Sequence, residues 1–428
     1  MALEWLSTVL EKKLGVRPTI GQTGPITEGS HGYMAQIRRI ELQWPVDRAD
    51  LPKSVVIKHA FARKNSRCPV AGSAADAWLD ASGDMDAEER AKAAAEKAKD
   101  MKKAYYYLIH IICISTIKVQ ELCHAAESQV YGLFDENCDK SLSDNPAPCP
   151  IPKTYASFGI SHDHPSIIME DITGATITDI VDGWTDKQVY TILDSIVNIH
   201  VMSFTTEKWK TVEIEEDDDM METFSQMAKT FATEILKRNP LPSLEKVSSH
   251  ILKDSSWFKG MYKKFADHPL SVLVHGDMWA PQFLWRGDTL AAIVDWQLTH
   301  KGSIVRSLVR NQFNHIFRQM EDFLRLVPLG VSSSDKIRLT PTLLNYYYTQ
   351  LNSKLEAKGF KIPFTYQEMM EEYKSSLPYA CGMAVFAFGM WSNSPVLKKG
   401  DSGDEGRISE MYSRMASLLD ECVHAYGW

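Results

Sequence analysis

SVLVHGDMWAPQFLWRGDTLAAIVDWQ, residues 271–297, is the stretch that decides the fold of this chain. Two apolar runs, 272–274 and 291–294, are each followed closely by an aspartate, Asp277 and Asp295. Short apolar runs bounded by polar residues predict buried strands. Each aspartate is then expected on the loop where its strand ends, and loops mounted on a rigid scaffold commonly carry the chemistry of a protein.

Two aspartates presented in this way can divide the work of phosphoryl transfer. One can accept a proton while the other holds a divalent metal, because that reaction mainly needs positioned groups and neutralised phosphate charge. The His-Gly-Asp triplet at 275–277 is weak evidence by itself, since such triplets recur by chance and usually form only a turn. The second strand and aspartate close behind it favour the kinase-like interpretation.

The segment VLVHGDMWAPQFLW, followed by AAIVDWQLTHKGS, resembles the paired catalytic and metal loops of the choline kinase and aminoglycoside phosphotransferase superfamily. More narrowly, it resembles the CHK kinase-like group of nematodes and insects, which includes ecdysteroid kinase-like proteins. The resemblance runs from about residue 29 to the C-terminus, apart from one insertion. It implies an α+β, two-lobed protein-kinase-like fold, with an antiparallel sheet and a helix in an N-terminal lobe at 1–172 and a mostly helical C-terminal lobe at 173–428.

The resemblance also implies roles for the residues of this stretch. Asp277 would act as the catalytic base, His275 would brace the turn beside it, and Asp295 would ligate magnesium. The family carries an asparagine five residues after the base as a second metal ligand, where this chain has Gln282. The extra methylene moves the amide oxygen by about a bond length, and magnesium demands near-octahedral geometry, so this departure bears on metal binding.

A second departure follows the metal loop. The family tends to carry an acidic residue shortly after the positions of Gly302 and Ser303, and this chain continues with Ile304, Val305, Arg306 and Ser307. The sequence therefore predicts that the brace supplied by that carboxylate is absent. Both departures concern the site rather than the architecture.

Two N-terminal features are expected to face the nucleotide. A turn containing Gly29 and Gly32 precedes a strand-like run, and glycines let backbone amides approach phosphates closely, although many such turns are plain hairpins. Lys58 ends the apolar run 55–57, where an unpartnered ammonium would be costly to bury. By resemblance Lys58 contacts the α and β phosphates of ATP. The alternative is a solvent-facing lysine on an edge strand.

Further nucleotide contacts come from the family pattern. His124, Glu127 and Tyr131 match its spacing on a predicted helix, and Glu127 is the candidate partner of Lys58. The apolar strand 167–169 runs into Glu170 and Asp171, the segment that links the lobes and hydrogen-bonds adenine in kinase folds. The expected cofactors are therefore ATP and Mg²⁺.

Composition limits the classes of function. The 428 residues are 44% hydrophobic and 24% charged, which is ordinary for a soluble globular protein. A net charge of −8 argues against a general nucleic-acid binder, which needs clustered lysine and arginine. Seven scattered cysteines without a CxxC pair indicate reduced thiols in a cytoplasmic protein, and the first residues do not resemble a secretory signal.

An insertion at about 62–120 has no counterpart in the family and no functional account. Its first part is rich in Ala, Glu and Lys, and it ends near the apolar run Tyr105 to Ile117. A bilayer span needs about 20 apolar residues, and this run is shorter and contains His110, so no membrane span is predicted. A membrane-associated protein that uses this run is the third and least favoured interpretation.

The expected function is transfer of phosphate from ATP to a hydroxyl of a small molecule, steroid-like or a xenobiotic metabolite by analogy with the group, in a monomer or dimer. The alternative is a catalytically impaired pseudokinase that binds nucleotide or a protein partner, which Gln282, Ser307 and the insertion favour. Aromatic residues near the C-terminus, such as Phe386 and Trp391, are expected to line either the core or a substrate pocket.

Overall fold

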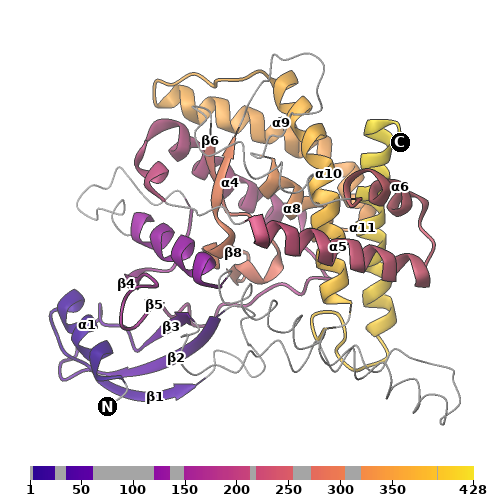
Figure 1. Cartoon of the computed structure of the whole chain (residues 1–428). Helices are drawn as coiled ribbons and strands as arrows, with labels where there is room; N and C mark the ends of the chain where they lie inside the picture. Colours follow the sequence, from indigo (N-terminus) through magenta and orange to yellow (C-terminus); the bar gives the residue numbers. More distant parts are fainter. Residues whose placement is uncertain are drawn as a thin grey trace, which may run out of the picture. The chain divides into compact units, whose positions relative to one another are not determined.

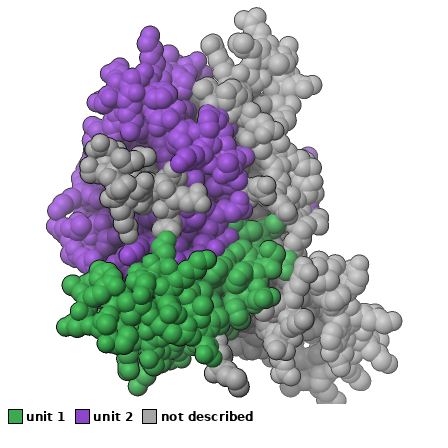
Figure 2. Space-filling view, turned by 90° about the vertical axis from the view of Figure 1, so that its left-hand side faces the viewer, with its two compact units in different colours: residues 1–125, 158–168 green, residues 126–157, 169–428 purple. Residues whose placement is uncertain are grey.

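The computed structural model describes residues 3–24, 35–60, 120–134, 149–212, 218–253, 271–303, 320–392 and 394–428 (Figure 1). These residues divide into two compact units, one within 1–125 and 158–168 and the other within 126–157 and 169–428 (Figure 2). Two predicted features lie outside the described residues. They are the turn with Gly29 and Gly32, and the insertion at about 62–120 with its apolar run 105–117, of which only residue 120 is described.

The N-terminal part combines one helix with a sheet. Helix α1, Glu4–Leu14, buries Leu6 and Leu10 on one face and ends at Gly15, whose φ of 76° suits a residue without a Cβ. The sheet has the order β1-β2-β3-β5-β4. Its strands are β1 Thr19–Gly24, β2 Ala35–Gln43, β3 Ser54–Ala60, β4 Thr154–Phe158 and β5 Ser166–Glu170. The antiparallel register of β2 and β3 sets Ile37 opposite Lys58.

The C-terminal part is mostly helical. Residues 120–134 are helical as well, and the helices that follow are α4 Asp186–Thr205, α5 Asp218–Arg238, α6 Pro242–Ile251, α8 Glu321–Gly330, α9 Ser333–Ala357, α10 Tyr366–Trp391 and α11 Asp404–Tyr426. Capping boxes start α4 at Thr185 and α10 at Thr365. The predicted α+β class, a sheet with a helix followed by a mostly helical part, is confirmed.

Two small antiparallel pairs carry the loops of interest. Strand β6, Ser271–Val274, pairs with β9, His300–Ser303, and β7, Phe283–Arg286, pairs with β8, Thr289–Ile293. The helices pack around them: α4 contacts β6 and α9, while α10 lies against α5 and α11 (Figure 1). Helix α4 buries Ile192, Leu193 and Ile196 in the core.

Within the described ranges, no helix combines the length and apolar character needed to cross a lipid bilayer.

One buried arginine ties α11 to two chain turns. Arg414 is 2% exposed, and its guanidinium donates to the carbonyls of Ile180, Val181 and Leu329 and to the carboxylate of Glu410. Those carbonyls lie before α4 and near the end of α8, so one side chain satisfies acceptors that no helix ladder reaches.

We expect Arg414→Met to lower the free energy of unfolding by about 3 kcal/mol or more, because each buried carbonyl left without a donor costs roughly 1–3 kcal/mol. Arg338→Met is the matched control, since that side chain is 54% exposed and pairs with Asp186 and Asp335 at the surface. Exposed pairs contribute at most about 1 kcal/mol. Urea unfolding of both variants measures the difference, and equal losses would contradict the assignment.

Candidate active site

The loop after β6 carries the predicted base and its neighbour. His275 is fully buried, and its ring lies 4.5 Å from the ring of Trp296. Its Nδ1 accepts from the amide of Asp277 at 3.2 Å, so Nε2 carries the proton and donates to the carbonyl of Val294 at 3.1 Å. His275 thus connects the loop that holds Asp277 to the end of β8.

Asp295 lies in the loop after β8, where the backbone is strained. Its φ of 68° is the one positive φ of a non-glycine residue in the described part of the chain. A left-handed conformation costs an aspartate on the order of 1 kcal/mol, so the surrounding contacts must hold it. Oδ2 of Asp295 accepts from Nε2 of Gln282 at 3.0 Å and from Nε2 of Gln297 at 3.3 Å.

Gln282 joins the two aspartates. It ends the short 3₁₀ turn Ala280–Gln282 and is 5% exposed. Its side-chain Nε2 lies 3.1 Å from Oδ2 of Asp277 and 3.0 Å from Oδ2 of Asp295. Its backbone carbonyl accepts from the amide of Val294. Three predicted site residues, Asp277, Gln282 and Asp295, therefore converge on one point.

The environment of Asp277 favours the neutral acid. Burial, and to a smaller extent the charge of Asp295, raise the pKa of this carboxyl. The guanidinium of Arg325 and the hydrogen bonds from Gln282 and Trp279 lower it. The net pKa lies above the usual value for aspartate. A carboxyl whose pKa is moved toward neutrality is a better proton acceptor than an ordinary aspartate.

Arg325, which the sequence did not single out, clamps the same loop from α8. Its Nη2 lies 3.4 Å from Oδ1 of Asp277 and 3.1 Å from the carbonyl of Gly276. Nothing in the local pattern of α8 distinguishes this arginine from a surface residue.

A carboxylate brace is present, so the prediction that it is absent is wrong. Asp322, at the start of α8, accepts the amide of His275 at 2.9 Å through Oδ2 and the amide of Gly276 at 2.8 Å through Oδ1. The brace comes from further along the chain than the family spacing suggests. An acidic residue in the first turn of a helix is common, so the sequence offered no signal for this role.

An indole pair lies beside Asp277. Nε1 of Trp279 donates to Oδ2 of Asp277 at 3.1 Å, and the Trp279 ring stacks on Trp391, at the end of α10, with centroids 4.9 Å apart and planes 19° from parallel. The sequence predicted that Trp391 lines either the core or a substrate pocket. In the structure it packs against Trp279, on the loop that carries Asp277.

Helix 120–134 places two of its residues next to the loop that carries Asp295. Tyr131 is fully buried, and burial together with the charges of Glu127 and Asp295 raises the pKa of its phenol well above the usual value. Phe134 packs its edge against Trp296 at 5.1 Å. Glu127, four residues before Tyr131 on this helix, is 1% exposed.

The predicted nucleotide residues are placed as follows. Lys58 lies on β3 between β2 and β5 and is 5% exposed, which excludes a solvent-facing lysine on an edge strand. Lys58 and Glu127 belong to different units, so their pairing stays a prediction. Glu170 ends β5 and accepts the amide of Lys153 at 3.2 Å, and Asp171 next to it is buried.

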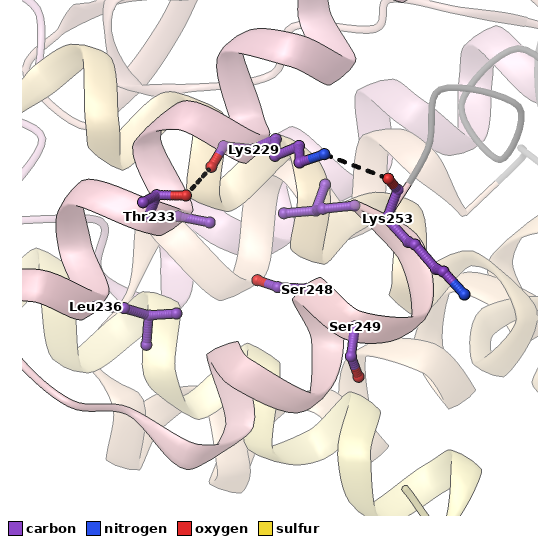
Figure 3. Close-up of a pocket in the computed structure, with 8 residues that line it drawn as sticks. Lys229, Thr233, Leu236, Ser248, Ser249 and Lys253 are labelled. Carbon is purple, nitrogen blue, oxygen red and sulfur yellow. Dashed lines mark hydrogen bonds between the residues drawn. The ribbon is translucent and has the colours of Figure 1, made fainter.

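The described residues contain no cluster of three His, Cys, Asp or Glu side chains that could hold a metal ion. A cavity of about 470 Å³ lies between α5 and α6 (Figure 3). Its lining residues are Lys229, Ala232, Thr233, Leu236, Ser248, Ser249, Leu252 and Lys253. None of the predicted site residues lines it.

Comparison with known proteins identifies relatives. The model of the DUF1679 family, described as "Uncharacterized oxidoreductase dhs-27", matches residues 3–427. An uncharacterised kinase-like protein of Caenorhabditis elegans is 23% identical over 292 residues, which cover 64% of this chain and 70% of that protein. The uncharacterised oxidoreductase dhs-27 of the same organism is 24% identical over 228 residues, which cover 49% of this chain and 25% of that protein.

Solved structures show a distant likeness. A macrolide 2'-phosphotransferase from Brachybacterium faecium aligns with 97% of this chain and 97% of its own, at 11% identity and a TM-score of 0.38.

Gly276 has no room for a side chain. Its φ is +80°, and an added Cβ would lie 2.4 Å from the carbonyl oxygen of Leu298 and 3.1 Å from Nδ1 of His300. Gly287, in the turn between β7 and β8, has a φ of +56° and no neighbour within 4 Å of an added Cβ. The two glycines thus separate the effect of backbone strain from that of a steric clash.

We expect Gly287→Ala to lower the free energy of unfolding by about 1 kcal/mol through backbone strain alone. Gly276→Ala adds a clash with a backbone oxygen and is expected to lower it by about 3 kcal/mol or more. Urea unfolding of both variants gives the comparison. Similar losses for the two would show that the loop before Asp277 does not pack against Leu298 as described.

Proposed function

This chain belongs to the DUF1679 family, and we propose that it is an ATP-dependent kinase that phosphorylates a hydroxyl group of a small molecule. The kinase-like relative supports this proposal, because it aligns over 70% of its own length. The oxidoreductase name belongs to a protein of which the match covers 25%, so that name is not carried over.

The observation that carries the proposal is the meeting of Asp277 and Asp295 at the amide of Gln282. The two carboxylates come from the ends of two different strands and point to one place. We assign Asp277 as the base that takes the proton of the acceptor hydroxyl. Its raised pKa suits that task, and the charge of Arg325 opposes the rise and favours the ionised form. His275 and Arg325 would hold Asp277 in position and would not take part in the transfer themselves.

The donor atoms at this place fit magnesium. Asp295, Asp277 and a rotated Gln282 amide offer oxygens, the ligands that a hard cation prefers, and magnesium is commonly held by one or two carboxylates with water and phosphate oxygens completing its shell. A site of that kind needs no cluster of three acidic or histidine ligands. When bound, the ion would neutralise charge on the transferred phosphoryl group.

The nucleotide assignments are part of the same proposal. Lys58 would contact the phosphates of ATP, the turn at Gly29 and Gly32 would cover them, and the backbone near Glu170 and Asp171 would receive the adenine. The burial of Lys58 supports its assignment, because a buried ammonium must be compensated by a partner or a ligand. A cytoplasmic location also remains part of the proposal.

The acceptor is proposed to be a hydroxylated apolar ring compound. The stacked pair of Trp279 and Trp391 supports this, because the Trp279 indole is partly exposed beside the base and offers a flat apolar surface. The hydrogen bond from Trp279 to Asp277 would then couple acceptor binding to the base.

The rival is a pseudokinase. Gln282 favours it, since its amide nitrogen donates to both aspartates and occupies oxygens that a cation would need. In that case the fold would bind nucleotide or a protein partner without turnover.

Calorimetric titration with ATP, with and without magnesium, tests the proposal. We expect the native protein to bind ATP at least about tenfold more tightly with magnesium, which corresponds to about 1.4 kcal/mol. Asp295→Asn should remove this gain, and Asp288→Asn, at an 82% exposed carboxylate paired with Lys187, should keep it. Asp277→Asn should bind ATP but transfer no phosphate.

Two results would contradict the kinase. Binding that ignores magnesium, or no binding of ATP at all, favours the pseudokinase. A large gain of magnesium affinity in Gln282→Asn would show that the native amide impairs the site.

Two variants of Trp279 separate its two contacts, once an acceptor has been found among ring alcohols. Trp279→Phe keeps a ring against Trp391 and loses the hydrogen bond to Asp277. That bond lowers the pKa of Asp277, so its loss should move the acidic limb of the pH–rate profile to higher pH. The limb moves to higher pH because Asp277 can accept a proton only when it is ionised, and a higher pKa means that ionisation needs a higher pH.

Trp279→Leu loses the ring as well, and the KM for the acceptor should rise about fivefold beyond that of Trp279→Phe if stacking contributes on the order of 1 kcal/mol. Equal KM values for the two variants would remove Trp279 from the acceptor site.

A further inference from the structure

Behind the catalytic loop lies a buried group of ionisable side chains that the proposed chemistry does not use. His300 comes from β9, Glu321 and Asp322 from the start of α8, and Glu372 and Tyr379 from α10. All five are buried. Burying charged groups is costly unless they are paired and hydrogen-bonded, so this arrangement needs a physical reason.

The contacts of His300 determine how many protons it shares with Glu321. Its Nδ1 lies 2.9 Å from the carbonyl oxygen of Leu298, which can only accept, so Nδ1 carries a proton. Its Nε2 lies 2.9 Å from Oε2 of Glu321. A second proton must lie between these two atoms, either on the imidazole or on the carboxyl. The other oxygen of Glu321 accepts from the hydroxyl of Tyr379 at 2.9 Å.

The pair is therefore neutral as a whole while it keeps this shared proton. Loss of the proton would leave a net negative charge and would break the contact between Nε2 and Glu321, because a ring with one proton can serve only one acceptor. The added charge would lie next to Asp322, on the adjacent residue of the same helix.

Asp322 is the connection to the site. It holds the amides of His275 and Gly276, immediately before Asp277. The pKa of Asp322 is raised to about 6, chiefly by burial. The two amides and the charge of His300 lower this pKa, whereas the charge of Glu321 raises it. The state of the His300–Glu321 pair thus acts directly on the carboxyl that holds the loop.

His300 also contacts the loop region through packing. A Cβ added to Gly276 would meet both the carbonyl oxygen of Leu298 and the ring of His300, so the loop before Asp277 and the segment after Asp295 meet at this histidine. Leu298 ends the 3₁₀ turn Trp296–Leu298 that follows Asp295.

Other titratable groups face this cluster. Glu372 accepts the amide of Met320 at 3.2 Å, and Tyr347 of α9, whose pKa is raised first by burial and then by the charges of Glu372 and Asp322, is hydrogen-bonded to His200 of α4. Arg325 and Asp277, both largely buried, form an ion pair on the same loop. With this many carboxyls nearby, the proton on the His300–Glu321 pair limits the negative charge behind the loop.

We propose that His300 and Glu321 are positioning residues whose single shared proton keeps Asp322 bound to the loop amides and so holds Asp277 in place for the proposed transfer. The inference rests on the proposed function for its consequence in catalysis. The proton-linked brace itself is a property of the fold, so it can be measured without turnover.

Hydrogen exchange of the His275 and Gly276 amides, resolved by mass spectrometry of overlapping peptides between pH 6 and 9.5, tests the brace. Rates are divided by those of the unstructured peptide at each pH. In the native protein we expect protection that falls by roughly tenfold at the alkaline end, as the shared proton is lost and the brace opens.

Three variants and a control define the outcome. Glu321→Gln cannot release the shared proton, so the alkaline fall should vanish. His300→Gln should lower protection at every pH and also abolish the fall. Tyr379→Phe keeps the ring volume but removes a donor to the ionised form of Glu321, so the pair should hold its proton more tightly and the fall should move to higher pH. His250→Gln, at an exposed histidine of α6, should behave like the native protein.

A role in packing alone would lower protection in these variants without changing its pH dependence, and that result overturns the proposal. Tyr379→Phe keeps the test valid if His300→Gln does not fold, since its shift in pH is specific to the shared proton. Calorimetry with ATP and magnesium is run on the same samples. If protection falls at alkaline pH as expected but the protein binds no ATP, the brace is supported and the kinase is rejected. If the protein binds ATP with magnesium but protection does not depend on pH, the kinase is supported and the brace is rejected.

Discussion

The site depends on one carboxylate, that of Asp322, which accepts two consecutive backbone amides from His275 and Gly276. A loop that carries a reactive aspartate must leave backbone donors without strand partners, and buried donors of that kind need acceptors. Asp322 supplies both acceptors from a helix. The loop can then turn sharply at Gly276, where no side chain would fit, and direct Asp277 toward Gln282 and Asp295.

The second aspartate is held by a different means. Asp295 adopts a left-handed conformation that is unfavourable for its type, and the contacts of Gln282 and Gln297 with its carboxylate accompany that strain. His275 links the two loops by bonding to Val294, the residue before Asp295. Strain and polar contacts are thus concentrated where two strands end, as expected of a site whose geometry matters more than its stability.

Local patterns predicted much of this arrangement. The strands before Asp277 and Asp295 follow from short apolar runs bounded by polar residues, a pattern that extends over only a few residues. The burial of Lys58 also agrees with the apolar run that precedes it. The error over the brace arose because a family spacing was applied to a chain in which the carboxylate comes from a later helix.

The sequence by itself therefore determined the class of fold, the two loops with their aspartates and the substitution of glutamine at position 282. Only the tertiary structure decided which groups surround Asp277. Asp322, Arg325 and Trp391 reach it from α8 and from the end of α10. The contact between His300 and Glu321 likewise forms only when β9 and α8 are packed together. The physical reason is that charge, burial and hydrogen bonding at one point sum over residues far apart in the chain, whereas periodicity reports only on neighbours.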